Sequence, residues 1–380
     1  MADTSTTSGL PTASRQLRSL VRPSGVLELS IVEVPVPAPG PDEVVVRVEA
    51  APINPSDLGL LLAGADVAKA GTSDGGVSIA LTPDATRALT ARHDESLAVG
   101  NEGAGVVVAT GSSDAARHLE GRVVGVIGGA MYSQYRTVPV AQCLPYPDGV
   151  TPAQGASWFV NPMTVLGMVE TMRVEGFRAL VHTAAASNLG QMLNRICLTD
   201  GIDLVSIVRS SEQVELLRSQ GAVHVLDSTA PDFDAELTDA LVATGAMLAF
   251  DAIGGGTLAS RILTAMEAAA NLGATEYSRY GSSVPKRVYI YGTLDRGPTE
   301  LSRTFGFQWS VAGWLLTPFM QKLGADGAQR LRSRVADEIT TTFASHYTAT
   351  ISLDDVLDLD VLRSYARIRT GEKYLVDPSR

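Results

Sequence analysis

The chain has only two cysteines, Cys143 and Cys197, among its 380 residues. They lie far apart in the sequence and form no C-x-x-C pair, so a four-thiolate zinc site and a disulfide framework are both excluded. Cys197 falls on the apolar face of a predicted helix, which favours a small buried hydrophobic residue over a nucleophile or a ligand. This scarcity of cysteine predicts a reducing, cytoplasmic environment.

Long apolar runs and basic clusters are also missing. No segment approaches the roughly 20 apolar residues that a membrane-spanning helix needs, and the first dozen residues lack the basic and apolar regions of a signal peptide. The formal net charge is −11, without a block of Lys or Arg. Because binding to nucleic-acid phosphates requires a basic face, we expect no nucleic acid among the partners, and the missing apolar run argues against a membrane.

Apolar residues (45%) and glycine (36 residues) are plentiful, as in a globular α/β protein with a sizeable core and many tight turns. The length suits two domains better than one. We predict a flexible tail over 1–25, a β-rich domain over 26–150 and 340–380, and an α/β domain over 151–339. Residues 66–94 are rich in small polar residues, with one strand-like run at 78–81, and are predicted to form a partly mobile insertion or lid.

Strand and helix patterns alternate regularly from residue 179 onward. Strands are predicted at 179–182, 204–208, 223–226, 247–250 and 288–291, and helices at 189–200, 211–220, 234–244 and 257–272. Such alternation predicts a doubly wound parallel sheet, an α/β fold of the Rossmann-like kind. A helical stretch containing Trp309, Trp314, Leu315 and Phe319 is expected to follow, then an amphipathic helix over 326–344.

The segment 179–209 carries the clearest functional signal. A buried strand, a turn of small residues, a helix and a second strand present the helix N-terminus to a phosphate. The glycine fingerprint is degenerate, reading Ala185-x-Ser187-x-x-Gly190, so a turn without a ligand remains the alternative. Arg209 stands where an acidic residue would hydrogen-bond a ribose hydroxyl, which favours a 2′-phosphate and hence NADP(H). The predicted cofactor contacts here are Ala185, Ser187, Asn188, Leu189, Arg209, Ser210 and Ser211.

Several short motifs occur in one order: A-P-I-N-P-S-D at 51–57, G-N-E-G-A-G-V-V at 100–107, N-P-M-T-V-L at 161–166, F-D-A-I-G-G at 250–255, Y-I-Y-G at 289–292 and T-G-E-K at 370–373. This order resembles the medium-chain dehydrogenase/reductase superfamily, particularly its zinc-independent quinone oxidoreductase branch. The resemblance implies a β-rich GroES-like catalytic domain beside the Rossmann-like one. It also implies cofactor contacts from Thr164, Gly292, Thr293 and Lys373. For Thr164 a helix-capping role stays open, and for Lys373 a solvated charge.

This chain departs from the superfamily pattern at the positions that hold the catalytic zinc in zinc-dependent members. Asn101 stands where zinc-dependent members have a histidine ligand, and 50–57 has no cysteine, so no metal is expected. His182 and His224, each alone on a strand, are predicted to be structural. Without a metal, hydrogen bonds must stabilise the developing oxyanion, and Asn54 and Asp57 are the catalytic candidates. For Asn54, an Asx turn is the alternative to a contact with the cofactor or the substrate, and for Asp57 the alternative is a helix N-cap.

The predicted function is therefore zinc-independent, NADPH-dependent hydride transfer to a quinone or an α,β-unsaturated carbonyl compound. Enoyl-thioester reductases of this superfamily have a tyrosine some eight residues after the aspartate, where this chain has Ala65 or Asp66. Enoyl-thioester reduction remains the alternative, as does a non-catalytic NADPH-binding protein. A homodimer is expected because the strand at 288–291 would be an exposed edge beside an aromatic segment, unless those aromatics pack inside their own domain.

Overall fold

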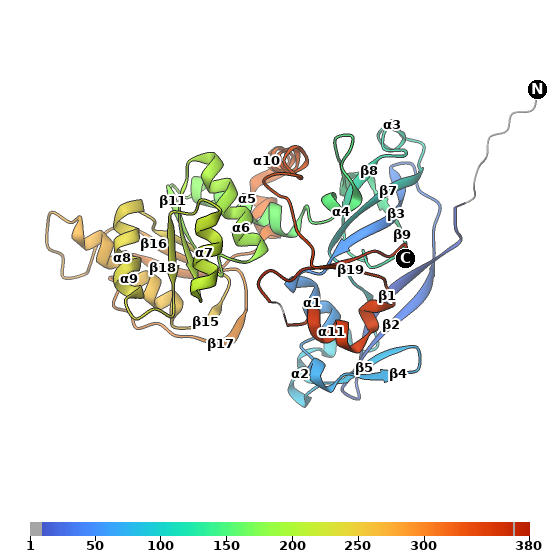
Figure 1. The fold of residues 1–380 in the computed structure, drawn as a ribbon, viewed down its shortest axis with the longest axis horizontal. Helices are drawn as coiled ribbons and strands as arrows, with labels where there is room; N and C mark the ends of the chain where they lie inside the picture. Colours follow the sequence, from blue (N-terminus) through green and yellow to red (C-terminus); the bar gives the residue numbers. More distant parts are fainter. Residues whose placement is uncertain (1–9, 368) are drawn as a thin grey trace, which may run out of the picture. The chain divides into compact units, whose positions relative to one another are not determined.

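The computed structural model describes residues 10–367 and 369–380, which form two compact units (Figure 1). The first unit comprises the chain up to Val160 and from Arg332 onward, and the second is Asn161–Leu331. The second unit is thus inserted into the first. Its boundaries lie near, but not at, the predicted 150/151 and 339/340.

The main sheet of the first unit is built around β3 (Glu43–Pro52), whose apolar side chains are almost all buried. Its strands run in the order β10-β8-β7-β3-β20-β19, and β9 also pairs with β3. The remaining strands are β7 (Glu102–Thr110), β8 (Val123–Ile127), β9 (Tyr135–Pro139), β10 (Cys143–Pro145), β19 (Ala349–Ile351) and β20 (Tyr374–Val376). Val376 pairs with Ala51, so the end of the described chain completes this sheet.

A second sheet in the same unit corrects two predictions. Its order is β4-β5-β2-β1-β6, with β1 (Ala13–Arg22), β2 (Val26–Pro35), β4 (Gly71–Ser73), β5 (Gly76–Ala80) and β6 (Ser96–Ala98). The predicted tail over 1–25 is wrong from Ala13 on, because β1 pairs along its whole length with β2 and buries Leu17 and Val21 completely. Residues 1–9 lie outside the described residues.

The prediction of a partly mobile insertion or lid over 66–94 is also wrong, because this segment forms regular strands and helices. Only its strand-like run was recognised, and that run corresponds to β5, which pairs with β2 and buries Val77 and Ile79. Helix α2 (Pro83–Ala88) follows, capped by the Thr82 hydroxyl, which accepts the Ala85 N–H at 3.2 Å. The segment is ordered because it extends an existing sheet rather than forming one of its own.

The second unit contains a six-stranded sheet in the order β13-β12-β11-β14-β16-β18, with every pairing parallel. The strands are β11 (Ala179–Thr183), β12 (Asp203–Val208), β13 (His224–Asp227), β14 (Leu248–Asp251), β16 (Lys286–Ile290) and β18 (Trp309–Gly313). The helices between them are α6 (Asn188–Asp200), α7 (Ser211–Ser219), α8 (Phe233–Thr244) and α9 (Leu258–Leu272). A shared apolar core joins α8 and α9 to the sheet. This unit and the β-rich unit confirm the predicted fold class.

Two expectations about the end of this sheet are wrong. The predicted edge strand is β16, but it lies between β14 and β18, and Trp309 belongs to β18 instead of a helix. The aromatics also pack within their own unit. The Trp314 ring lies 5.5 Å from that of Phe250, and its Nε1–H donates to Thr171 Oγ1 at 3.1 Å. The Trp309 ring lies 4.8 Å from that of Phe305.

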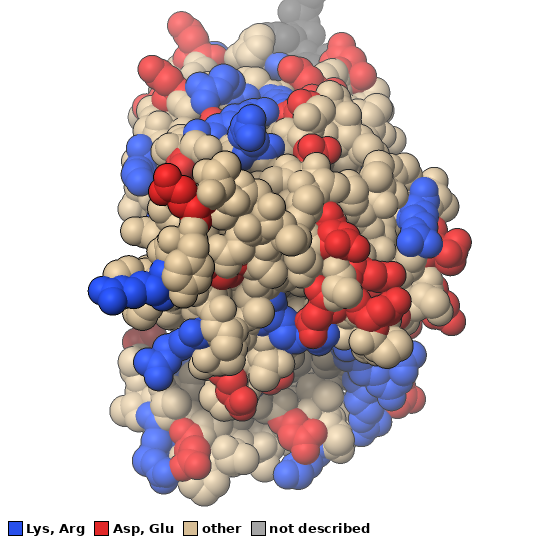
Figure 2. Space-filling model, turned by 90° about the vertical axis from the view of Figure 1, so that its left-hand side faces the viewer, with Lys and Arg blue, Asp and Glu red and all other residues tan. Residues whose placement is uncertain are grey.

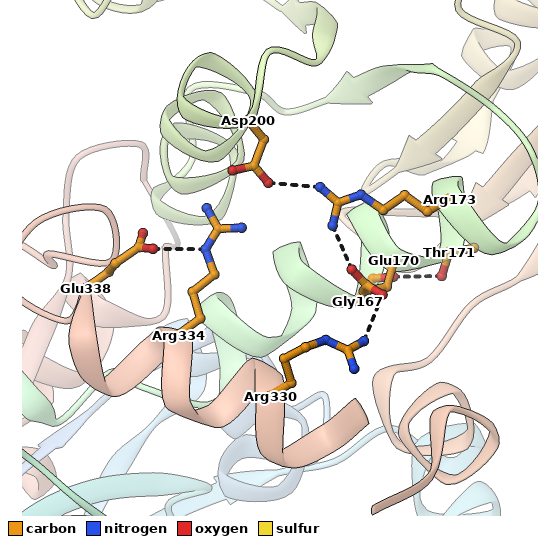
Figure 3. Close-up of polar contacts among 8 residues, drawn as sticks. All are labelled: Gly167, Glu170, Thr171, Arg173, Asp200, Arg330, Arg334 and Glu338. Atoms are coloured by element: carbon orange, nitrogen blue, oxygen red, sulfur yellow. Dashed lines mark hydrogen bonds and ion pairs between the residues drawn. The ribbon is translucent and has the colours of Figure 1, made fainter. Parts of the chain in front are cut away.

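Charged side chains connect three helices of the second unit (Figure 3). Glu170 of α5 (Val160–Val174) accepts from Arg173 at 2.7 Å and from Arg330 of α10 (Leu316–Asp337) at 3.4 Å. Arg173 also pairs with Asp200 of α6 at 3.1 Å. Both arginines are largely exposed, so each pair contributes little stability individually.

On the face shown in Figure 2, acidic and basic side chains are separated by wide uncharged areas. Among the described residues, no helix has the length and apolar character to span a bilayer.

Candidate functional site

The turn between β11 and α6 has the geometry of a phosphate-binding turn. Ser187 is the N-cap of α6, and its Oγ accepts the Gly190 N–H at 3.1 Å. A Cβ on Gly190 would lie 2.2 Å from the Ala185 carbonyl oxygen, so only glycine fits there. The left-handed residue of the turn is Ala184 (φ 50°), not Ala185 or Ser187. Ala and Ser can therefore occupy the first two fingerprint positions without strain.

Arg209 lies at the same edge of the sheet as this turn. Thr183 is opposite Ile207 in the parallel register, and the Ala185 N–H donates to the Ile207 carbonyl oxygen at 3.1 Å. Arg209 follows two residues later and is exposed, with its backbone N–H bound to Gln213 Oε1 at 3.1 Å. Within the described chain, no ion pair engages its guanidinium. The predicted contacts Asn188 and Leu189 open α6, Ser210 caps α7, and Ser211 is the first residue of α7.

The carboxyl ends of β11, β14 and β16 meet at this edge around Asp251, which sequence reasoning did not select. Its buried carboxylate accepts the Thr183 hydroxyl at 2.6 Å and the N–H groups of Ile253 and Gly254. Gly292 lies next to it, where a Cβ would come within 2.6 Å of the Ala252 carbonyl oxygen. Thr293 beyond it is exposed, and Thr164 is a nearly buried residue inside α5, not a capping residue at its end.

In the first unit, Asp57 fastens the start of α1 (Pro55–Leu62) to the loop before β7. Its Oδ2 accepts the Asn54 N–H at 2.8 Å, and its Oδ1 accepts the Asn101 N–H at 2.7 Å. Burial raises the pKa of this carboxyl to about 7, against the opposing effect of the two N–H donors. The N-cap of α1 is Asn54, so the N-cap alternative for Asp57 is wrong; Asp57 is the third residue of the helix, and its carboxylate stabilises the helix start by accepting the Asn54 N–H.

Glu102, the first residue of β7, is a fully buried carboxyl that sequence reasoning missed as a site residue. Its Oε2 accepts the N–H groups of Phe159 (2.6 Å) and Val160 (3.0 Å), and its Oε1 accepts Asn54 Nδ2 at 2.9 Å. Burial raises the pKa of Glu102, and the charge of Lys373 opposes that rise. An acidic residue opening an apolar run at 102–108 was the available signal, because such a buried charge requires partners.

Lys373 is buried, so its interpretation as a solvated charge is wrong. Its Nζ donates to Ser157 Oγ at 2.7 Å and lies 5.7 Å from the ring centroid of Tyr347. Burial lowers the pKa of Lys373 to about 8, while the charges of Glu102 and Asp57 favour the protonated form. The predicted cofactor contact therefore belongs to a buried polar cluster of the first unit, together with Asn54, Asp57 and Glu102.

Asn101 contacts this cluster through its backbone N–H, which donates to Asp57 Oδ1. Its Nδ2 donates to the exposed Ser56 hydroxyl at 3.1 Å. Over residues 10–367 and 369–380, no three His, Cys, Asp or Glu side chains are grouped closely enough to hold a metal ion. Cys143 and Cys197 are both buried free thiols.

Residues 40–148 match the family model of the alcohol dehydrogenase GroES-like domain. The synaptic vesicle membrane protein VAT-1 homolog of Rattus norvegicus is 30% identical over 222 residues, covering 58% of this chain and 48% of that protein. The mitochondrial enoyl-[acyl-carrier-protein] reductase of Xenopus tropicalis is 31% identical over 57% of each chain. The chain thus spans about half the length of the curated relatives it matches.

Solved structures cover more of the chain. An NADPH:quinone reductase-like protein from Mesorhizobium loti is 26% identical with a TM-score of 0.72, covering 97% of this chain and 100% of its own. A similar protein from Bacillus thuringiensis, at 20% identity and a TM-score of 0.71, shares the fold. The GroES-like match and the inserted parallel-sheet unit together give the two-part architecture that these solved structures share. These matches support the resemblance to the medium-chain dehydrogenase/reductase superfamily and to its quinone oxidoreductase-like branch.

Proposed function

We propose that this protein is an NADPH-dependent, zinc-independent oxidoreductase that transfers hydride to a quinone or an α,β-unsaturated carbonyl compound. The observation that carries the proposal is the β11–α6 turn with Arg209 at the same sheet edge. Gly190 lets the backbone approach closely there, as a pyrophosphate requires, and Arg209 supplies a positive charge for a 2′-phosphate.

The residues of the second unit fit the proposed cofactor. Ala185, Ser187, Asn188 and Leu189 would hold the pyrophosphate, and Arg209, Ser210 and Ser211 the 2′-phosphate. The glycine at 292 and its neighbour Thr293, together with Thr164, remain candidates for the nicotinamide half. NADPH supplies the hydride when bound, and the protein contributes binding, orientation and polar contacts.

The acceptor assignment is supported by the residues eight and nine positions after Asp57 in the sequence. Ala65 and Asp66 stand where enoyl-thioester reductases of the superfamily have a tyrosine, and the Asp66 carboxylate caps a short 3₁₀ helix by accepting the Ala68 N–H. A quinone or small enone therefore suits the chain better than an acyl thioester. Several relatives are enoyl reductases by name, so activated-alkene reduction is the second candidate.

Zinc independence is proposed from Asn101, whose amide is a poor zinc ligand and is bound to Ser56. A cytoplasmic location is proposed from the two free thiols. We also propose a homodimer. In the described sheet β16 lies between β14 and β18, so β18 is the edge strand and takes the place of β16 as the strand that would pair with a second copy.

Measuring NADPH consumption against quinones, enones and acyl thioesters tests the function. Quinone or enone reduction with little activity towards acyl thioesters is expected. Preference for acyl thioesters would favour the second candidate. NADPH binding without turnover of any acceptor would favour a non-catalytic protein.

A further inference from the structure

We propose that Asp251 is a positioning residue for the nucleotide turn, the residues 184–187 between β11 and α6. It holds the Thr183 hydroxyl and thereby keeps Ala184 in its left-handed conformation. This inference rests on the proposed function and concerns the second unit alone. It gives a role to a buried carboxylate that is not among the predicted cofactor contacts.

The Thr183 hydroxyl continues the pairing of two strands beyond their last ladder pair. Backbone pairing between β11 and β14 ends at His182 and Phe250. One residue further, Thr183 Oγ1 donates to Asp251 Oδ1 at 2.6 Å and accepts the Ala252 N–H at 2.8 Å. Thr183 and Asp251 are completely buried, so water does not compete for these hydrogen bonds. On the β14 side, the end of β11 is therefore fixed through a side chain.

Ala184 needs support from its neighbours. Its φ is 50°, a left-handed conformation in which the Cβ of an L residue is strained. On the β12 side, the Ala185 N–H donates to the Ile207 carbonyl oxygen at 3.1 Å. Thr183 and Ala185 are thus each anchored to a neighbouring strand, and Ala184 has to bridge between them. Loss of either anchor would let Ala184 relax to a negative φ and would move the turn.

The carboxylate of Asp251 is itself held in place. Its Oδ1 also accepts the Ile253 N–H at 3.0 Å, and its Oδ2 accepts the Gly254 N–H at 3.1 Å. These donors compensate for the burial of the group. A negative charge at the sheet edge proposed for the pyrophosphate would by itself repel that ligand. The role that Asp251 can have there is therefore geometric, and its removal should weaken the nucleotide instead of strengthening it.

Thr183→Val removes the hydroxyl with almost no change of shape, and Thr183→Ser keeps it as the matched control. In T183V no donor at position 183 reaches Asp251, so the turn loses its anchor on the β14 side. We expect the Kd for NADPH, measured by the fluorescence of the nucleotide, to rise roughly tenfold or more in T183V. In T183S it should stay within about threefold of the unmutated value. Thermal unfolding is recorded alongside.

Adenosine 2′-monophosphate separates positioning from general damage. This fragment carries the 2′-phosphate proposed to bind at Arg209, but it has no pyrophosphate. Its Kd, measured by titration calorimetry, should stay within about threefold in T183V, because the anchor acts on the turn and not on Arg209. A distortion of the whole unit would weaken both ligands alike, and that result overturns the inference.

Ala184→Gly tests the conformational step. Glycine adopts a left-handed φ without strain, so a turn with glycine at position 184 depends less on its anchors. We expect T183V/A184G to bind NADPH at least about threefold more tightly than T183V. A folded double variant without recovery overturns the inference. Should T183V not fold, Asp251→Ala with and without Ala184→Gly gives the same comparison.

The unmutated protein is measured first for NADPH binding and turnover. Failure to bind NADPH overturns the proposed function and this inference together. Binding without turnover of any acceptor removes only the proposed reaction, because the positioning tests are binding measurements. Normal NADPH binding by folded T183V overturns only the role of Asp251.

Discussion

His182 Nε2 lies 2.8 Å from the hydroxyl oxygen of Tyr291, although β14 separates β11 from β16 in the sheet. The two rings are stacked, with centroids 5.8 Å apart, and the imidazole is completely buried. Its Nδ1 has no partner among the described residues. Burial lowers the pKa of His182 to about 3, because the charged imidazolium would lose its hydration.

This pKa predicts a loss of stability in acid. Above pH 6.5 the imidazole is neutral in the folded and unfolded chains, and its contribution is complete. Between about 6.5 and about 3 only the unfolded chain takes up the proton, so stability falls by up to about 1.4 kcal/mol per pH unit. Urea unfolding at several pH values gives the free energy of unfolding as a function of pH. Between about pH 3 and 6.5 this free energy should fall less steeply for His182→Gln than for the unmutated protein, and an equally steep fall would contradict the prediction.

Gly190→Ala should damage the nucleotide turn directly. The new methyl group would lie 2.2 Å from the Ala185 carbonyl oxygen, so the turn must open, at a cost of about 1–3 kcal/mol or more. We expect a lower melting temperature and at least tenfold weaker NADPH binding. Gly313→Ala is the matched control in the same unit, since a Cβ there meets no atom within 4 Å. Equal effects of the two substitutions would refute the structural reason given.

Arg209→Ala should weaken NADPH and spare NADH. A charge-assisted hydrogen bond to a phosphate contributes on the order of 1.5–3 kcal/mol, which corresponds to a roughly ten- to hundredfold change in Kd. Arg218→Ala, an exposed arginine on the same helix-loop segment, serves as the control. Equal affinity of the unmutated protein for both cofactors would rule out the assigned preference.

Removing metal should leave folding and activity intact. Asn101 is bound to Ser56 through its amide nitrogen, and that nitrogen has no lone pair free to bind zinc, unlike the imidazole nitrogen of a histidine. Prolonged dialysis against a chelator, followed by activity and melting measurements, checks this expectation. Stoichiometric zinc that leaves together with activity would show that the zinc-dependent branch is the right one.

Light scattering at micromolar concentration should give twice the chain mass of 39.9 kDa. The edge strand β18 offers backbone groups for pairing about a two-fold axis. Trp309 and Trp314 are engaged inside the unit, so the backbone edge, not an aromatic patch, is the reason for this prediction. A particle of one chain mass at every concentration would exclude the dimer.

The parallel sheet of the second unit was predictable because its strands are short apolar runs buried on both faces. The predicted 179–182 and 204–208, for example, correspond to β11 and β12. The sequence predictions were wrong where pairing between strands, and not the local sequence pattern, determines the structure. Leu17 and Val21 alone do not indicate a strand, and β1 exists because β2 pairs with it along ten residues.

The nucleotide turn was visible in the sequence because its residues are consecutive. The buried cluster of the first unit was not, because Asn54, Glu102, Ser157 and Lys373 are brought together only by the fold. Sequence patterns assign charged residues to the surface, since isolated charges are costly to bury. By that rule Lys373 was interpreted as a solvated charge and Glu102 was not selected as a site residue. Both are nevertheless buried, because residues from distant segments hydrogen-bond to them.

The insertion of one unit into the other sets an order of events during synthesis. Residues 161–331 are continuous, so this unit can fold as soon as it leaves the ribosome. The first unit must wait, because β20 pairs with β3 across more than 300 residues of sequence. Until residues 374–376 emerge, β3 lacks this neighbour, and the half-built sheet is the stage at which a chaperone would be needed most.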